Sequence, residues 1–137
     1  MGYGMTQVSA RFHIKKENHT KALEAIKSMA GKETCDISSH YPAHFSWVRS
    51  NFVSSSCLEE ALNCWRWDPD LDSDGNIIDL NFNGEKYGDD NSLFKTIAPF
   101  VEDGSEIEMR GEDGGYWKWM FDGNTCKEVQ GKVVYKL

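Results

Sequence analysis

A cysteine and two histidines lie close together in the first half of the chain and have the spacing of potential zinc ligands. Cys35, His40 and His44 form a C-x4-H-x3-H pattern, for which Cys57 or Cys64 would supply a fourth ligand. Zinc needs four nitrogen, sulfur or oxygen ligands, and structural sites usually contain a C-x2-C pair, which this sequence lacks. Polar histidines in a loop, together with buried thiols, explain the same residues, so both interpretations stay open.

An acidic loop in the middle of the chain has the composition of a calcium site. Residues 70–77 read DLDSDGNI, which resembles the first two-thirds of an EF-hand loop. Ca²⁺ prefers several oxygen ligands on one tight loop, and this pattern supplies them. The twelfth position, which needs a bidentate glutamate, is Asn81, so the alternative to a calcium-binding module at residues 70–79 is an acidic, solvated turn. The predicted ligands are Asp70, Asp72, Asp74 and Asn76.

Two aromatic triplets, W-R-W at residues 65–67 and W-K-W at residues 117–119, each place two indoles two residues apart. On a β-strand, side chains two residues apart share a face, so Trp117, Trp119 and Phe121 would form an aromatic stripe. An exposed stripe would bind a small molecule or a peptide, whereas a buried stripe would form the core beneath the helices.

The sequence contains no motif of an enzyme. A G-x-S-x-G elbow, a P-loop and a dinucleotide fingerprint are all absent. The glycine-rich residues 111–115 join two predicted strands rather than opening a helix, so no helix dipole would face a phosphate group there. We therefore expect a non-enzymatic protein with no cofactor other than calcium.

The charge of the chain is strongly asymmetric. The net charge is −7, yet residues 1–67 carry eight Lys or Arg against six Asp or Glu, while residues 68–128 carry five against sixteen. Such an acidic region repels phosphate backbones, so we expect no direct binding of nucleic acid.

The expected partner is a protein with a basic surface, which the acidic C-terminal half would attract and orient. A narrower hypothesis is an inhibitor of phage type that imitates the charge of nucleic acid. The predicted interaction residues are Glu102, Asp103, Glu106, Glu108, Glu112, Asp113, Trp117 and Trp119. No apolar run approaches the roughly 20 residues that span a bilayer, and unclustered cysteines fit a reducing, cytoplasmic location.

The first part of the chain shows two clear patterns of hydrophobic residues. Residues 7–14 alternate with period two, which predicts a strand that buries Val8, Ala10, Phe12 and Ile14. A helix is predicted to begin at Asn18 and end at Gly31, with residues 22, 23, 26, 29 and 30 on its apolar face. Residues 32–56 are predicted to form a long connection with one short strand near residues 45–52.

The rest of the chain predicts two more helices and four strands. A capping box at residues 56–59 opens a short helix. Residues 68–76 are predicted to form a turn, followed by a strand that buries Ile78, Leu80 and Phe82. A third helix is capped by residue 89 or 90 and limited by Pro99. Three strands then form a meander, with turns at residues 113–115 and 122–124.

These elements predict one α+β domain of two layers over residues 1–137. Three helices would pack on a mainly antiparallel sheet of five or six strands that ends in the three-strand meander. Residues 1–5 are expected to be disordered or an added remnant outside the domain.

The C-terminal part of the chain resembles a group of small bacterial and phage proteins of unknown function. Residues 93–128 contain a helix followed by EDGSEIEMRGEDGGYWKWMFDGN, and those proteins end in a helix and an acidic β-meander. The same segment is more distantly similar to phage-associated ferredoxin-like domains. The resemblance covers about a quarter of the chain and implies an α+β fold and a bacterial or mobile-element setting. It implies no activity.

Overall fold

The computed structural model describes residues 4–34, 55–84 and 90–131, and the structural statements below concern these residues. The predicted α+β class is confirmed, with three α-helices in this part of the chain. The strands form a sheet of four and a separate sheet of two rather than one sheet of five or six. The predicted strand near residues 45–52 lies outside the described residues.

The four-stranded sheet is antiparallel and has the order β1-β4-β5-β6. The strands are β1 (Met5–Arg11), β4 (Glu106–Gly111), β5 (Tyr116–Phe121) and β6 (Cys126–Gln130). The last three are the predicted meander, and Gly114 and Gly123 adopt the positive φ that its two turns require. Met5 pairs with Gly111 and is buried, so the expectation that residues 1–5 are disordered or an added remnant is wrong for Met5, and residues 1–3 lie outside the described residues.

The two-stranded sheet pairs β2 (Trp67–Leu71) with β3 (Ile77–Phe82). The prediction of a turn over residues 68–76 is wrong for residues 68–71, which belong to β2. The strand was not predicted because Pro69 and the aspartates around it are typical of turns. Proline cannot donate a ladder hydrogen bond and, within sheets, is found mainly in edge strands. β2 is such an edge, and Pro69 lies opposite Leu80 with its side chain buried.

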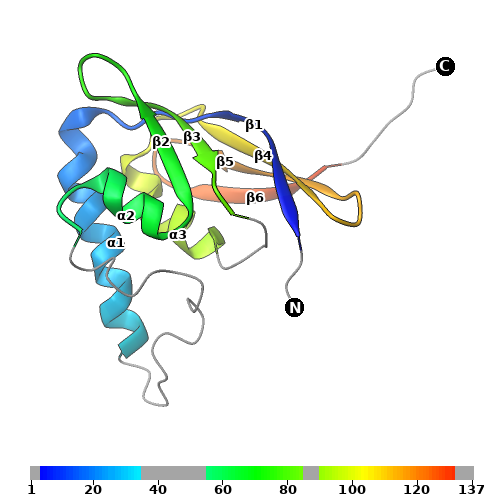
Figure 1. Cartoon of the computed structure of the whole chain (residues 1–137), viewed down its shortest axis with the longest axis horizontal. Coiled ribbons are helices and arrows are strands. Elements are labelled where there is room, and N and C mark those ends of the chain that lie inside the picture. Colours follow the sequence, from blue (N-terminus) through cyan, green and yellow to red (C-terminus); the bar gives the residue numbers. More distant parts are fainter. Residues whose placement is uncertain (1–3, 35–54, 85–89, 132–137) are drawn as a thin grey trace.

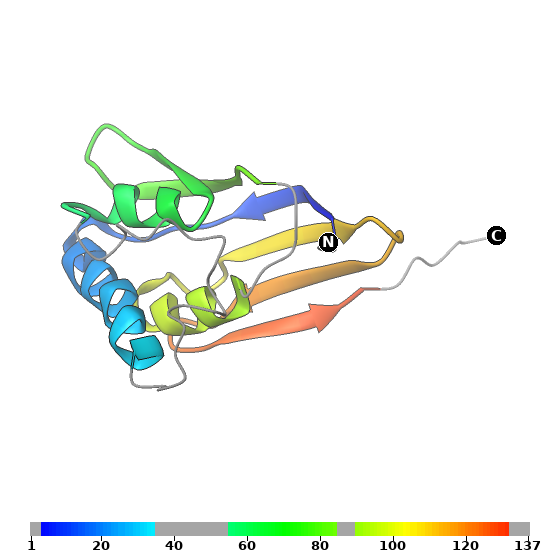
Figure 2. The ribbon, with the colours of Figure 1, turned by 60° about the horizontal axis from the view of Figure 1, so that its bottom comes forward.

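A glutamine side chain joins the two sheets. The amide of Gln7 on β1 donates to the carbonyl of Leu80 (3.0 Å) and accepts from the backbone N–H of Phe82 (2.6 Å). Farther along, Ile14 and Ile77 form an isolated antiparallel bridge with two backbone hydrogen bonds of 3.0 Å. β3 therefore lies beside β1, and Figure 2 shows the hairpin continuing the layer of the four-stranded sheet at its β1 edge.

Two irregularities interrupt the expected alternation of side chains. The register of β1 against β4 shifts between Gln7 and Ser9, and that of β2 against β3 shifts at Leu71. As a result Val8 and Ile78 are exposed, although each was predicted to face the core. A β-bulge adds one residue to a strand, so every side chain beyond it changes face.

The helices lie beside the same face of the sheet (Figure 1). A short 3₁₀ turn, η1 (Lys16–Asn18), leads into α1 (His19–Thr34), which extends past Gly31, the predicted end. α2 (Leu58–Cys64) has Cys57 as its N-cap residue. In the predicted capping box, Glu60 rather than Glu59 accepts the hydrogen bonds from Ser56. α3 (Asp90–Ile97) continues into η4 (Ala98–Phe100), and its predicted apolar residues 93, 94, 97 and 101 are all buried.

Aromatic rings form the centre of the core between the helices and the sheet. Phe94 of α3 packs against Trp119 of β5, with ring centroids 4.8 Å apart. Trp67 of β2 contacts both rings, at 5.1 and 6.1 Å, and thereby brings the hairpin into the same core. The edge-to-face geometry of such contacts adds to the hydrophobic stabilisation.

Candidate functional site

The acidic loop forms the turn of the β2–β3 hairpin. The carboxylate of Asp72 accepts the backbone N–H groups of Asp74 and Asn76, each at 2.9 Å, and the side-chain amide of Asn76. Asp70 lies on β2 and accepts from Asn81 across the ladder at 3.1 Å. The acidic turn, which was the alternative interpretation, is therefore present.

Calcium binding at this loop stays a prediction. Within the described ranges, no three acidic, histidine or cysteine side chains converge in the geometry of a metal site. Asp72 is engaged by its own turn, whereas Asp74 is exposed at the tip. If calcium binds here, it raises the melting temperature, and replacing Asp70 and Asp74 by Ala abolishes that rise.

The predicted zinc ligands Cys35, His40 and His44 lie outside the described residues. Of the additional candidates, Cys64 is buried and Cys57 is partly exposed at the start of α2. The zinc prediction is therefore neither supported nor opposed by the described geometry.

The aromatic stripe is part of the core. Trp119 has no exposed surface, Trp117 is 6% exposed, and Phe121 is 4% exposed. The prediction that Trp117 and Trp119 contact a partner is therefore wrong, because both indoles lie in the core: Trp119 packs against Phe94 of α3, and Trp117 packs against Trp119.

The six predicted acidic interaction residues do not gather on one surface. Glu106 and Glu108 lie on the outer side of β4, where Lys118 pairs with Glu106 at 3.2 Å. Glu112 and Asp113 lie in the β4–β5 turn, and Glu112 accepts the backbone N–H of Gly4. Glu102 and Asp103 lie at the other end of β4. These six residues therefore lie at both ends and on the outer side of the sheet, and their role in binding a partner stays a prediction.

Three of the aspartates stabilise hairpin turns by accepting backbone hydrogen bonds. Asp72, Asp113 and Asp122 each accept the backbone N–H group of the residue two positions later, at 2.9 Å. Backbone hydrogen bonds from Thr125 and Asn124 hold the pKa of the Asp122 carboxyl below its ordinary value, and those from Asn76 act in the same direction on the pKa of Asp72. These aspartates fix the turns as ionised carboxylates.

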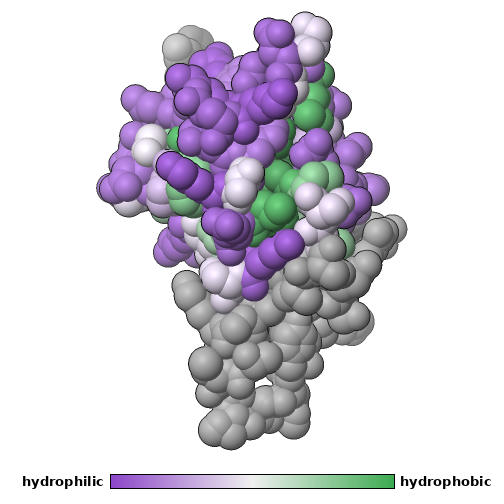
Figure 3. Space-filling view, turned by 90° about the vertical axis from the view of Figure 1, so that its left-hand side faces the viewer, coloured by the Kyte–Doolittle hydropathy of each residue, from purple (hydrophilic) through white to green (hydrophobic). Residues whose placement is uncertain are grey.

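An acidic surface does form, but at the end of the molecule that carries the β2–β3 turn. A cavity of about 380 Å³ lies there between the turn, residues 13–15 before η1 and the segment that enters β4. Its apolar lining includes Ile77, which is buried, and Ile78, which is exposed, and carboxylates of two segments, Asp72 of the turn and Glu102 with Asp103 before β4, also line it. We call this region the acidic end, and it comprises Asp72, Asp74, Ile78, Glu102 and Asp103. Figure 3 views this side of the molecule, where polar residues surround a smaller apolar area.

Basic residues reduce the charge of the acidic end without cancelling it. Lys15 approaches Glu102 at 3.8 Å, and both side chains are well exposed. Lys16 packs its aliphatic chain near Gly75, and its backbone N–H donates to Asn76. His13 also lines the cavity. Four carboxylates against two lysines leave the region negative.

A larger cavity of about 490 Å³ lies at the other end of the sheet, beside Arg110 and Tyr116. Four of the nine residues that line it are glycines, so it offers few side-chain groups to a ligand. Glu112, its acidic member, already accepts the N–H of Gly4. This cavity carries less recognition chemistry than the acidic end.

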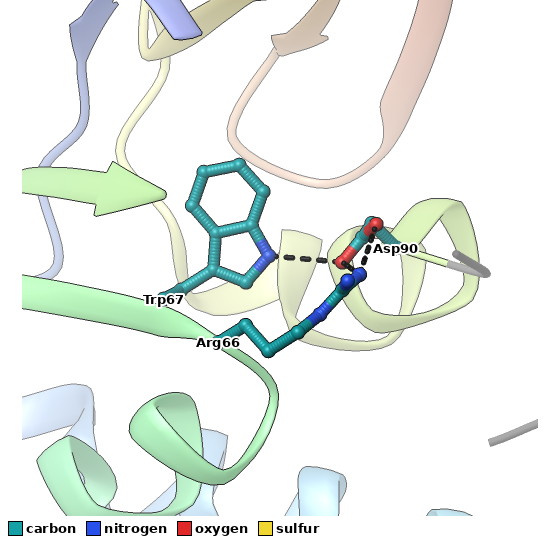
Figure 4. Close-up of polar contacts among 3 residues, drawn as sticks. All are labelled: Arg66, Trp67 and Asp90. Carbon is teal, nitrogen blue, oxygen red and sulfur yellow. Dashed lines mark hydrogen bonds and ion pairs between the residues drawn. The ribbon is translucent and has the colours of Figure 1, made fainter. Parts of the chain in front are cut away.

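A buried ion pair holds α3 against the hairpin and was not predicted from the sequence. Asp90, with no exposed surface, pairs with Arg66 at 3.2 Å and accepts from the indole N–H of Trp67 at 3.0 Å (Figure 4). Arg66 adopts a φ of 74°, which is unfavourable for a residue with a Cβ. Its guanidinium also lies 5.2 Å from the ring centroid of Phe82. This arrangement fixes the turn from α2 into β2 and is structural.

Comparisons of the chain with protein-family models, with curated protein sequences and with solved structures found no match. The bacterial or phage setting suggested by residues 93–128 therefore stays a prediction. None of the helices in the described ranges is both long and apolar enough to cross a membrane.

Proposed function

We propose that this chain is a non-enzymatic protein-binding domain that recognises a basic protein surface through its acidic end. The observation that carries the proposal is the cavity between Asp72, Glu102 and Asp103, whose lining combines these carboxylates with the apolar side chains of Ile77 and Ile78. A lysine or arginine side chain of a partner has the complementary form, an aliphatic stem with a cationic head.

The β2–β3 hairpin strengthens this charge. Residues 67–83 contain five aspartates and no lysine or arginine. Leu71 and Ile78 are about 40% exposed on the same hairpin, so the region offers apolar contacts as well as charge. Electrostatic complementarity would speed and orient the encounter, and the apolar contacts would slow dissociation.

Two other hypotheses, an aromatic-face binder and the narrower one of a nucleic-acid mimic, have less support. The indoles of the stripe are buried, as described above. A mimic of nucleic acid needs carboxylates spaced along one surface. The carboxylates of residues 68–128 are instead divided among the turns, the two ends of the molecule and the core.

Affinity capture with matched charge variants tests the proposal. Asp74→Lys with Asp103→Lys reverses two exposed acids of the acidic end that hold no turn together. Glu17→Lys with Glu24→Lys makes the same change of net charge on η1 and α1. We expect wild type and the second variant to retain a basic protein at low salt and the first to lose it. Recovery of the same proteins by all three chains would contradict the proposal.

A further inference from the structure

The outer side of the four-stranded sheet, opposite the helices, carries a second charged surface. The outward side chains of β1, β4, β5 and β6 are exposed or half-buried, and none is buried. Four are basic and two acidic, so this surface has a formal charge of +2 in a chain of −7. We call it the basic half, and its charged members are Arg11, Arg110, Lys118, Lys127, Glu106 and Glu108.

The basic half also carries exposed apolar side chains. Met120 and Val129 are 42% and 44% exposed, and the bulge on β1 exposes Val8 by 49%. Met120 pairs with Lys127, and Val129 with Lys118, so apolar and basic groups alternate on adjacent strands.

The outer side of the β2–β3 hairpin has the opposite charge. The pairs of Trp67 with Phe82 and of Pro69 with Leu80 face the core, so the pairs that alternate with them face outward: Asp68 with Asn81, and Asp70 with Asp79. We call these four residues the acidic half. Since β3 lies beside β1 and is joined to it by Gln7, the two halves belong to one layer (Figure 2).

We propose that two copies of the chain pack face to face through this layer, each acidic half lying on the basic half of the other copy. A surface with one acidic and one basic half is self-complementary about a two-fold axis, which is the requirement for a closed dimer. The exposed apolar groups would be buried in the same contact. This dimer goes beyond the proposed function and leaves the acidic end, at the tip of the hairpin, accessible.

The size of the layer suits a small specific interface. Six strands at the usual spacing and about six residues in length give a face of roughly 30 by 20 Å, or about 600 Å² for each copy. Specific dimers bury at least about 1,200 Å² in total, which two such faces provide.

A single-stranded nucleic acid is the rival occupant of this face, and the observations favour it less. Proteins that bind RNA on an open sheet stack several bases on aromatic side chains, whereas Tyr116 is the single aromatic residue among the outward side chains described. Glu106, Glu108 and the whole acidic half would also repel the phosphates.

Sedimentation of complementary charge variants tests the dimer. Arg110→Glu with Lys127→Glu makes the whole layer acidic, and Asp68→Lys with Asp70→Lys makes it basic. We expect wild type to sediment at twice its 15.6 kDa chain mass at low salt and to dissociate as salt rises. Each variant alone should be monomeric, and an equimolar mixture should restore the dimer.

The control is Lys21→Glu with Lys95→Glu, which changes exposed lysines of α1 and α3 and should leave the dimer intact. Circular dichroism confirms that each variant is folded. A monomeric wild type, a dimer that survives either layer variant, or a mixture that stays monomeric would each overturn the proposal. So would tight binding of an oligothymidine probe to wild type, with loss of that binding in the acidic variant.

Discussion

The two faces of the four-stranded sheet are built from alternate residues of the same strands, yet they have opposite surroundings. On β5, Trp117, Trp119 and Phe121 are buried in the core, whereas Lys118 between them is half-buried and Met120 is exposed. The inner face contributes to stability through close packing of rings. The outer face contributes little to folding, so its mixture of charges and exposed apolar groups is available for association.

The largest expected difference between the faces concerns β5 itself. Trp119→Ala should lower the free energy of unfolding by about 3–5 kcal/mol, because it leaves a cavity among Phe94 and Trp67. Met120→Ala, on the next residue, should change it by less than about 0.5 kcal/mol. Urea denaturation of both variants measures this contrast, and similar losses would contradict the assignment of the faces.

The ion pairs of the two sides should differ as well. Asp90→Ala leaves the guanidinium of Arg66, whose side chain is 16% exposed, without its carboxylate, and should cost about 3 kcal/mol. Glu106→Ala removes the ion pair with Lys118 on the outer face. Both side chains of this pair are more than 30% exposed, so the free energy of unfolding should fall by less than about 1 kcal/mol. Equal effects in urea denaturation would show that Asp90 is not buried as described.

The seam between the sheets should be weaker than the inner core. Gln7→Ala leaves the N–H of Phe82 and the carbonyl of Leu80 without their side-chain partner and should cost about 1–2 kcal/mol. Thr6→Ala, on the exposed side of β1, is the control. Hydrogen exchange should show faster exchange of the Phe82 amide in the first variant, and unchanged exchange would contradict the role of Gln7.

The smallest expected effect is the pH dependence of a turn. Because the pKa of Asp122 is lowered in the fold, its contribution is present above the unfolded pKa of about 3.9 and is lost as the pH falls through the folded value. Asp122→Asn keeps an oxygen acceptor but loses the titration. Its melting temperature should therefore fall less than that of wild type between neutral and strongly acidic pH, and identical curves would contradict this.

The sequence allowed the helices and the meander to be predicted because their periodicity is regular. It did not reveal the bulges at Val8 and Ile78, since both residues are apolar and continue the period-two pattern of the buried residues that follow them. β2 was missed because the chemistry of Pro69 and its neighbouring aspartates is typical of turns, although an edge strand tolerates it.

The candidate site was less predictable than the fold. The summed charge identified residues 68–128 as acidic, but the acidic side chains of this region are distributed over turns, the core and opposite ends of the molecule. Asp72, Glu102 and Asp103 meet only because the hairpin folds back beside the entry to β4. The pairing of Arg66 with Asp90 likewise spans 24 residues and follows from tertiary packing.

Site-specific photo-cross-linking in cells that naturally make the protein tests most directly whether the acidic end and the outer layer are separate contact surfaces. A photoreactive residue at Ser73, on the exposed tip of the hairpin, should link the chain to a basic protein. The same residue at Met120 should link it to a second copy, and at Thr20 on α1 it should link to neither. Identical products from all three positions, or none above those of the Thr20 control, would contradict the account.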